Sequence, residues 1–179
     1  PGTLNIQHNK AFSTWMGWFV NYDEPFILIA EKDQHDELVR MLMRIGLDNL
    51  SGYVPNISVW KELGKELETE EIISLDEMKE LAKRDDVQIV DLRGAAEYKA
   101  GHLKGADNVF VGTLPENLDK ISKDKQVVVH CKSGDRAAIG YSILAKNGFK
   151  NVKNYLNSYD EWVRNGNPVV REDEPAVGA

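Results

Sequence analysis

The sequence predicts an α/β fold with a parallel sheet flanked by helices, present in two copies. Apolar runs of strand character alternate along the chain with segments that start on helix-capping residues. Strands separated in this way by helices pair in parallel, with helices on both faces of the sheet. Two stretches of the chain also match each other at an almost constant offset, which is typical of an internal repeat.

The second half of the chain gives the clearer order of elements. A capping box of Ser74 with Glu77 opens the first helix, and Pro115 lies in the first turn of another. Gly148 ends the long helix as its C′ residue, and Ser158 caps the last one. The predicted strands are 87–92, 126–130 and 151–156, and the predicted helices are 74–83, one beginning at 113, 136–147 and 158–166.

The first half repeats the end of the second half. Matched residues lie 102 positions apart: Gly46 and Gly148, Tyr53 and Tyr155, Trp60 and Trp162, Gly64 and Gly166. Upstream, residues 2–6 match 105–109 at an offset of 103, as expected if loops carry the deletions. The pattern predicts a strand at 26–30, a helix at about 33–45, a strand near Tyr53 and a helix that carries Trp60.

The two copies are expected to differ in completeness. A full strand-and-helix section precedes residues 105–109, whereas one residue precedes 2–6, so the first copy should lack its first third. We expect an incomplete copy at 1–66, a polar acidic linker at 67–71, a complete copy at 72–172 and a tail at 173–179. The first residue is Pro1 rather than Met, so we expect a fragment or a processed chain.

Composition argues against several classes of function. The net charge of -7 disfavours general nucleic-acid binding, and no apolar run reaches the roughly 20 residues of a membrane helix. No signal peptide is visible, and a single cysteine cannot form an internal disulfide, so we expect a cytoplasmic, reduced protein. The histidines show no metal-ligand spacing, so we expect no metal and no cofactor in this chain.

The one cysteine, Cys131, ends an apolar run and begins a short polar loop that closes on Arg136. Gly134 gives this loop the freedom of a tight turn, and Lys132 adds a second cation. Backbone N–H groups at a helix N-terminus favour a thiolate and an anion beside it. Such a thiolate could attack an electrophilic sulfur and carry it as a persulfide. A cysteine that only fills space would not explain why these residue types meet in one loop.

The segment Cys131–Arg136 resembles the six-residue active loop of rhodanese-like sulfurtransferases. Further segments that resemble the family pattern are Asp91–Arg93, Glu97–Tyr98, Gly101–Ala106, Gly148–Phe149 and Trp162–Val169. Asn157–Ser158 departs from the usual Gly-Gly pair, and Phe110 stands where proline is common. The resemblance covers about 72–170 and implies a parallel five-stranded sheet in tandem rhodanese-like copies.

The resemblance also implies roles for individual residues. Cys131 would be the nucleophile. The loop residues would form the cradle for the sulfur or anion: Lys132, Ser133, Gly134, Asp135 and Arg136. The residues expected to support the site are Asp91, Arg93, Glu97 and His102. An acidic Asp135 should weaken the binding of an anionic donor unless its side chain points to solvent.

The expected reaction is a two-step sulfur transfer. Cys131 would take sulfane sulfur from thiosulfate, glutathione persulfide or another small persulfide and pass it to a thiol, sulfite or cyanide. In the first copy Ala30 falls opposite Cys131, and the loop 31–35 is acidic, so that copy should be inactive, with His35 a solvated side chain. An inactive copy before an active one resembles the end of a metallo-β-lactamase-fold protein with two rhodanese-like domains. An iron-containing, persulfide-oxidising domain would then precede Pro1.

Two other functions are open from the residues alone. Cysteine phosphatases also place a cysteine and an arginine around a loop after a strand, but their loop is one residue longer. A non-catalytic interaction or structural module of a larger persulfide-oxidising enzyme suits the first copy better than the second. The sequence leaves open whether the chain forms a homo-oligomer.

Overall fold

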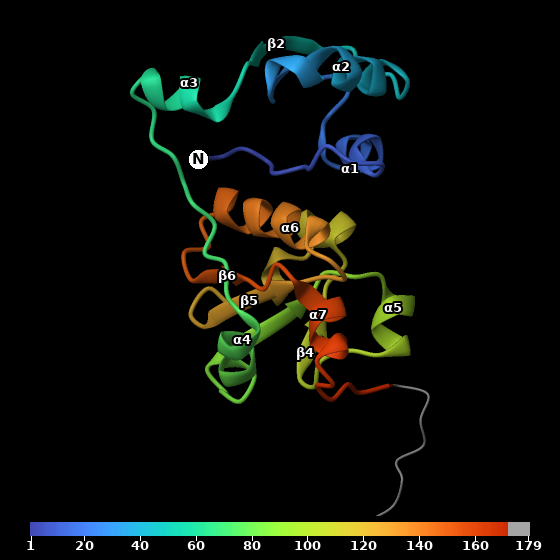
Figure 1. The fold of residues 1–179 in the computed structure, drawn as a ribbon, viewed down its shortest axis with the longest axis vertical. Helices are drawn as coiled ribbons and strands as arrows, with labels where there is room; N and C mark the ends of the chain where they lie inside the picture. The colour runs from blue at the N-terminus through green and yellow to red at the C-terminus, as the bar shows by residue number, and fades with distance from the viewer. Residues whose placement is uncertain (172–179) are drawn as a thin grey trace, which may run out of the picture. The chain divides into compact units, whose positions relative to one another are not determined.

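The computed structural model describes residues 1–171 and divides the chain into two compact units (Figure 1). The first contains Pro1 and Ile6–Thr69, and the second contains Gly2–Asn5 and the chain from Glu70 onward. The expected tail at 173–179, and residue 172, lie outside the described residues. Among the described residues, no helix has the length and apolar character to cross a membrane.

The first unit holds a small parallel sheet with helices around it. Its elements are α1 (Phe12–Phe19), β1 (Phe26–Ile29), η1 (Lys32–Gln34), α2 (His35–Met43), β2 (Leu50–Val54) and α3 (Ile57–Glu62). Strands β1 and β2 pair in parallel, and the predicted order of strand, helix, strand and helix is confirmed. The buried core consists of Phe12, Met16, Leu28, Leu38, Leu42 and Leu47.

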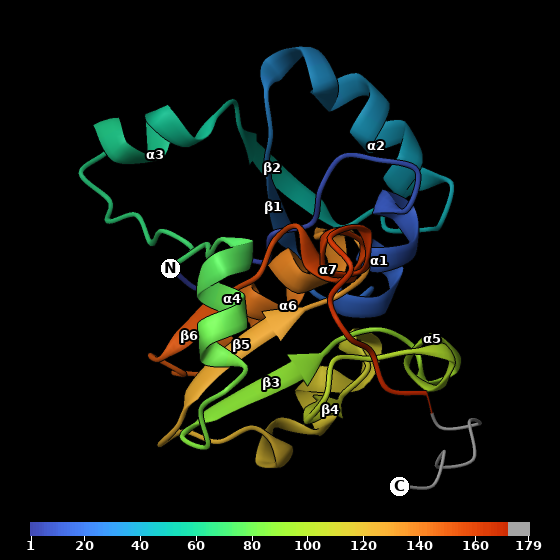
Figure 2. The same ribbon diagram turned by 60° about the horizontal axis from the view of Figure 1, so that its bottom comes forward.

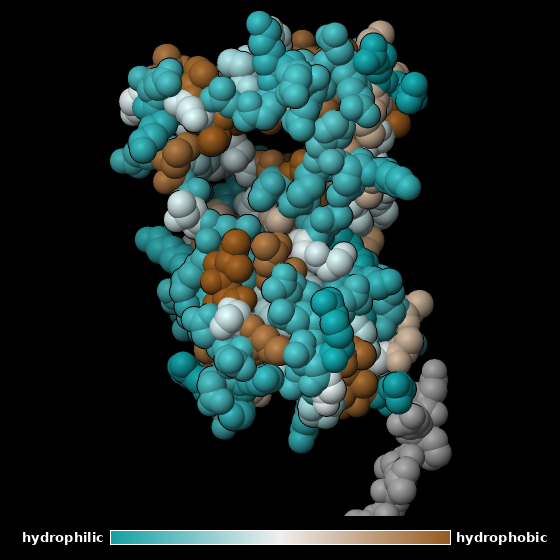
Figure 3. Space-filling model, viewed as in Figure 1, coloured by the Kyte–Doolittle hydropathy of each residue, from teal (hydrophilic) through white to brown (hydrophobic). Residues whose placement is uncertain are grey.

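This small unit leaves apolar side chains uncovered. Ile27 on β1 is 62% exposed and Tyr53 on β2 is 56% exposed. Ile57 and Leu63 are also exposed, and hydrophobic surface is visible where α3 lies (Figure 3). A two-stranded sheet offers too few neighbours to bury its apolar residues. The expectation for His35 was wrong: its side chain is buried. Its ring lies 4.0 Å from the Tyr53 ring, centre to centre, at a tilt of 55°, and a ring nitrogen lies 2.7 Å from the Ala30 carbonyl oxygen.

The second unit is a parallel sheet of four strands in the order β4-β3-β5-β6 (Figure 2). Its first elements are α4 (Leu75–Leu81), β3 (Val87–Asp91), α5 (Ala95–Ala100), β4 (Ala106–Asn108), η2 (Val111–Glu116) and η3 (Leu118–Lys120). Its remaining elements are β5 (Gln126–His130), α6 (Asp135–Lys146), β6 (Val152–Asn154) and α7 (Ser158–Arg164). The predicted α/β class with a helix-flanked parallel sheet is therefore confirmed.

Helices cover both faces of this sheet, with α6 on one side and α4 on the other (Figure 1). On the α4 side, Met78 packs with Ile89, Val128 and Trp162 in one buried cluster. The three valines of β5 are all buried, as a strand covered on both faces requires. The fold therefore places the carboxyl end of β5, with Cys131 directly after it, at an edge of a rigid core.

The expected fifth strand is reduced to a single bridge. Ile72 pairs in parallel with Asn154 of β6, where the Ile73 N–H donates to the Asn154 carbonyl oxygen. The helix α4 begins almost at once, because Ser74 and Glu77 form the predicted capping box. Backbone committed to a helix cap cannot continue a strand ladder, so the sheet has four strands and one bridge.

Two other local predictions differ from the structure. Pro115 lies inside the 3₁₀ helix η2 rather than in the first turn of an α-helix. Ser158 makes no capping hydrogen bond to α7 and instead has a left-handed backbone, with φ of 60°. The other predicted ends agree: Gly148 follows α6 with φ of 80°, as a C′ glycine does.

We expect Gly140→Ala to destabilise the second unit, although alanine is the better helix former by roughly 1 kcal/mol. A Cβ at Gly140 would lie 2.3 Å from Leu92 Cδ1, and Leu92 is fully buried on the sheet beneath α6. Overpacking of this kind costs about 1–3 kcal/mol. Urea unfolding should show a lower free energy of unfolding for Gly140→Ala. The double variant Leu92→Ala with Gly140→Ala should lose less free energy of unfolding than the sum of the losses of the two single variants. A stabilised Gly140→Ala variant would contradict the close packing of α6.

Candidate active site

Cys131 directly follows β5, and the helix α6 begins four residues later at Asp135. Its side chain is buried, and the Gly134 N–H donates to Cys131 Sγ over an N···S distance of 3.1 Å. Gly134 has φ of 113°, and a Cβ there would lie 2.8 Å from the Leu156 carbonyl oxygen. Only glycine suits this position, so the loop geometry and the backbone donor to the sulfur are linked.

The start of α7 holds the loop from a second side. The Tyr159 N–H donates to the Cys131 carbonyl oxygen at 3.1 Å, and the Asp160 N–H donates to the Lys132 carbonyl oxygen at 3.0 Å. Lys132 and Ser133 are exposed at the mouth of the loop. Two backbone hydrogen bonds from α7 therefore fix the loop at Cys131 and Lys132.

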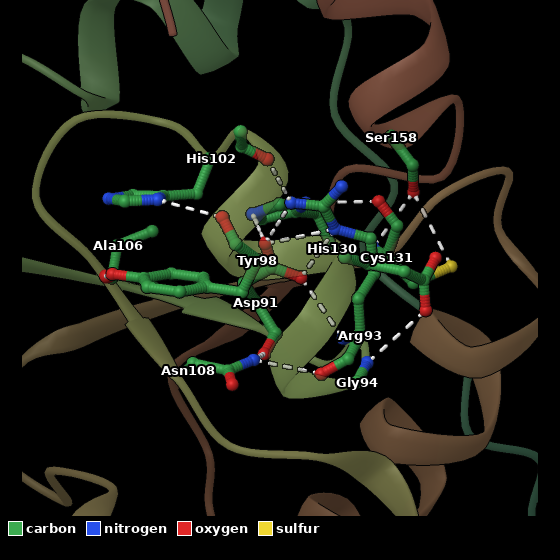
Figure 4. A network of polar contacts seen from close by, with 12 residues as sticks. Asp91, Arg93, Gly94, Tyr98, His102, Ala106, Asn108, His130, Cys131 and Ser158 are labelled. Atoms are coloured by element: carbon green, nitrogen blue, oxygen red, sulfur yellow. Dashed lines mark hydrogen bonds and ion pairs between the residues drawn. The ribbon is translucent and has the colours of Figure 1, made fainter. Parts of the chain in front are cut away.

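Ser158 is a residue of the site that the sequence interpretation assigned to helix capping. It is fully buried, accepts a hydrogen bond from the Cys131 N–H at 3.1 Å and donates one to the Tyr155 carbonyl oxygen at 2.9 Å (Figure 4). Its Oγ also lies 3.8 Å from Cys131 Sγ. The sequence signal for this role was the serine at a position where the family pattern has glycine. Glycine adopts positive φ without strain, so a serine there indicates that its hydroxyl has a task.

We expect Ser158→Ala to lower the free energy of unfolding by about 1–3 kcal/mol, because the buried Cys131 N–H would lose its acceptor. Ser158→Gly loses the same acceptor but relieves the backbone strain of roughly 1 kcal/mol at positive φ, so it should be the more stable of the two variants. Urea unfolding of both variants measures the difference. An alanine variant as stable as the wild type would show that the hydroxyl does not support the loop.

A buried ion pair lies at the end of the neighbouring strand. Asp91 and Arg93 are both almost fully buried, with Arg93 Nη2 2.6 Å from Asp91 Oδ2 and Nε 3.0 Å from Oδ1. Arg93 also donates to the Gly101 carbonyl oxygen at 2.8 Å, and its guanidinium lies 3.9 Å from the centre of the Tyr159 ring. This network ties the loop after α5 and the start of α7 to the sheet, as Figure 4 shows in part.

His130, which precedes Cys131, extends this network. It is fully buried and pairs across the sheet with Asp91, and its Nε2 lies 3.9 Å from Asp91 Oδ2. Burial lowers the pKa of His130, and the Asp91 carboxylate opposes that effect only in part. His130 is therefore neutral at neutral pH. The sequence interpretation treated this histidine as the last residue of a strand, without metal-ligand spacing, and gave it no role at the site.

Arg136 and Glu97 form a two-pronged ion pair. Arg136 Nη1 lies 2.5 Å from Glu97 Oε2, and Nη2 lies 2.9 Å from Oε1. The hydrogen bonds from Arg136 lower the pKa of Glu97, and those to Glu97 raise the pKa of Arg136 against the effect of burial. A negative charge on Cys131 also raises the pKa of Arg136.

The family model described as the rhodanese-like domain matches residues 74–165, within the second unit. The chain belongs to the rhodanese-like domain family.

Three relatives and structures illustrate the match. A sulfurtransferase of Allochromatium vinosum is 33% identical over 90 residues, covering 50% of this chain and 84% of the relative. A tRNA uridine(34) hydroxylase of Hamiltonella defensa is 33% identical over 102 residues, covering 54% of this chain but 29% of that protein. The crystal structure of a rhodanese-related protein from Thermoplasma volcanium matches 57% of this chain and 99% of that chain, with a TM-score of 0.53 and 25% identity.

The rhodanese-like domain thus brings together most of the residues expected at the site. Cys131 and its loop, Asp91, Arg93 and Glu97 meet at the carboxyl ends of β3 and β5. His102 does not join them: it stacks on Tyr98 and exchanges backbone hydrogen bonds with Val170, apart from Cys131 (Figure 4). Asp135 is partly exposed in the first turn of α6, where a carboxylate interacts favourably with the helix dipole. Within residues 1–171, no group of three or more His, Cys, Asp or Glu side chains could hold a metal ion.

Proposed function

We propose that this rhodanese-like domain is a sulfurtransferase that carries sulfane sulfur on Cys131. The observation that carries the proposal is the buried thiol at the N-terminus of α6, with the Gly134 N–H directed at its sulfur. A donor N–H at this distance stabilises negative charge on sulfur, both on the thiolate and on the persulfide that follows. The matched relative that is named a sulfurtransferase supports the same reaction class.

The first step loads the enzyme. The Cys131 thiolate attacks the sulfane sulfur of a small donor such as thiosulfate or glutathione persulfide, and a new S–S bond forms. The old bond of the donor breaks and its electron pair leaves with sulfite or with the thiolate of glutathione. In the second step a thiol, sulfite or cyanide attacks the outer sulfur, and the bonding pair returns to Cys131 as thiolate.

The phosphatase alternative finds less support at this loop. A phosphoryl group needs a wider cradle than a single sulfur atom, and this loop places four residues between Cys131 and Arg136. The non-catalytic alternative predicts a site in which the thiol is dispensable. It does not account for a glycine in a left-handed conformation that directs its N–H at the sulfur.

We further propose that the first unit is an incomplete, inactive rhodanese-like copy, so that residues 1–66, 67–71 and 72–172 form copy, linker and active domain. In the repeat Ile27 corresponds to Val128, and Ile27 is 62% exposed where Val128 is fully buried. Strands β1 and β2 also pair in parallel as β5 and β6 do. A preceding metallo-β-lactamase-like domain with an iron site, and a cytoplasmic location, belong to the same proposal.

Intact mass spectrometry tests the proposed function directly. Incubation with thiosulfate or glutathione persulfide should add one sulfur atom to the chain, and cyanide should remove it. Because the chain has one cysteine, the adduct can be assigned without digestion. A chain that gains no sulfur from either donor would overturn the proposal and favour a structural or interaction role.

A further inference from the structure

We propose that Glu97 selects the charge of the sulfur donor, so that the site prefers organic donors with at most one negative charge near the sulfane sulfur over dianionic thiosulfate. The inference rests on the proposed sulfur transfer and names the donor class within it. Arg136 is the cation that closes the loop around Cys131. Both terminal nitrogens of its guanidinium donate hydrogen bonds to the Glu97 carboxylate.

The ion pair with Glu97 reduces the positive charge that Arg136 presents to an anion near Cys131. Arg136 is 17% exposed and Glu97 is 38% exposed, so the carboxylate is the more accessible partner. A bidentate pair satisfies the planar fork that arginine otherwise presents to carboxylate or sulfonate oxygens. Arg136 keeps its remaining N–H groups, but Glu97 offsets the positive charge that Arg136 offers to an incoming anionic donor.

The balance of formal charges at the loop points in the same direction. Lys132 is the other loop cation and is exposed, while Asp135 opposes it at the start of α6. With Glu97 cancelling Arg136, the Cys131 thiolate leaves the group with a net negative charge. The loop thus does not form the positive cradle that its two cations would suggest.

The consequence for donors follows from Coulomb's law. The interaction of Glu97 with a donor scales with the charge on that donor, so a dianion is disfavoured twice as strongly in energy as a monoanion at the same place. Thiosulfate carries two charges next to its sulfane sulfur. Methanethiosulfonate has the same sulfane sulfur on a sulfonyl group but carries one charge, and it releases methanesulfinate when Cys131 takes the sulfur.

The test compares these two donors on wild type and Glu97→Gln. Glutamine keeps the size of the side chain and an oxygen that can accept the Gly94 N–H, which Glu97 now accepts at 3.3 Å. We expect kcat/KM with cyanide as acceptor to rise about tenfold for thiosulfate and about threefold for methanethiosulfonate. The exposed Glu116→Gln variant changes the net charge of the chain equally and should leave both values unchanged.

The outcomes separate this inference from the proposed function. If the wild type takes sulfur neither from these two donors nor from glutathione persulfide, the proposed function itself fails. A second outcome is that the wild type takes sulfur from both donors and Glu97→Gln changes kcat/KM for thiosulfate and for methanethiosulfonate by the same factor, or lowers both. In that case Glu97 only positions the loop, and the proposed selection by donor charge is overturned. If Glu97→Gln does not fold, the salt dependence of the wild type is measured instead. Because salt screens the repulsion of a dianion more than that of a monoanion, the ratio of kcat/KM for thiosulfate to kcat/KM for methanethiosulfonate should rise with ionic strength. A constant or falling ratio would overturn the inference.

Discussion

Replacing Cys131 with serine should abolish sulfur loading and reduce thiosulfate-to-cyanide transfer by roughly a thousandfold or more. The oxygen of serine is a far weaker nucleophile toward sulfur at neutral pH, and no other thiol in the chain can take its place. Intact mass spectrometry after incubation with thiosulfate measures loading, and thiocyanate formation measures turnover. The expected result is a sulfur adduct on the wild type and none on the variant.

The Cys131→Ser variant should keep its fold, which makes the comparison clean. Serine is close in size to cysteine, and the Cys131 N–H and carbonyl that hold the loop to Ser158 and Tyr159 are backbone groups that the change retains. Thermal unfolding of both proteins checks this point, and Glu116→Gln serves as a surface variant that should load like the wild type. A serine variant that still gains sulfur, or still turns over, would place the reaction elsewhere.

Helices and strands could be predicted where the residues that define their ends lie close together in the sequence. Ser74 with Glu77 begins a helix because both partners of the capping box lie within one turn, and Gly148 ends another because its own φ is positive. The strand before Cys131 was equally visible, since a strand buried on both faces reads as an unbroken apolar run. These signals placed the nucleophile at a strand-to-helix junction before any contact was known.

The rest of the site depends on partners that are distant in the sequence. Ser158 binds the Cys131 N–H across 27 residues, and Arg136 binds Glu97 across 39. No local pattern predicts that Glu97 pairs with Arg136, so the loop sequence alone favours Arg136 as the cation that binds the donor. His130 likewise reads as a strand residue, and its burial against Asp91 becomes visible only in the folded sheet.

Asp91→Asn should lower the free energy of unfolding of the rhodanese-like domain by about 3–5 kcal/mol. The change leaves the Arg93 guanidinium, which is 3% exposed, without its counter-ion. A buried charge without a partner destabilises the folded state by more free energy than the original ion pair contributed to it. The loss should appear in urea as a lower midpoint with an unchanged slope.

The surface pair of Arg84 with Asp86 provides a matched control. It has the same 2.6 Å distance between Nη2 and Oδ2, but both side chains are more than half exposed, so Asp86→Asn should leave the urea midpoint unchanged. Replacing both buried partners, as in Asp91→Asn with Arg93→Met, should cost less than Asp91→Asn alone, because no charge is then left unpaired. If Asp91→Asn proved as mild as Asp86→Asn, the Asp91–Arg93 pair could not be what holds the loop after α5 and the start of α7 against β3, the strand that pairs with β5.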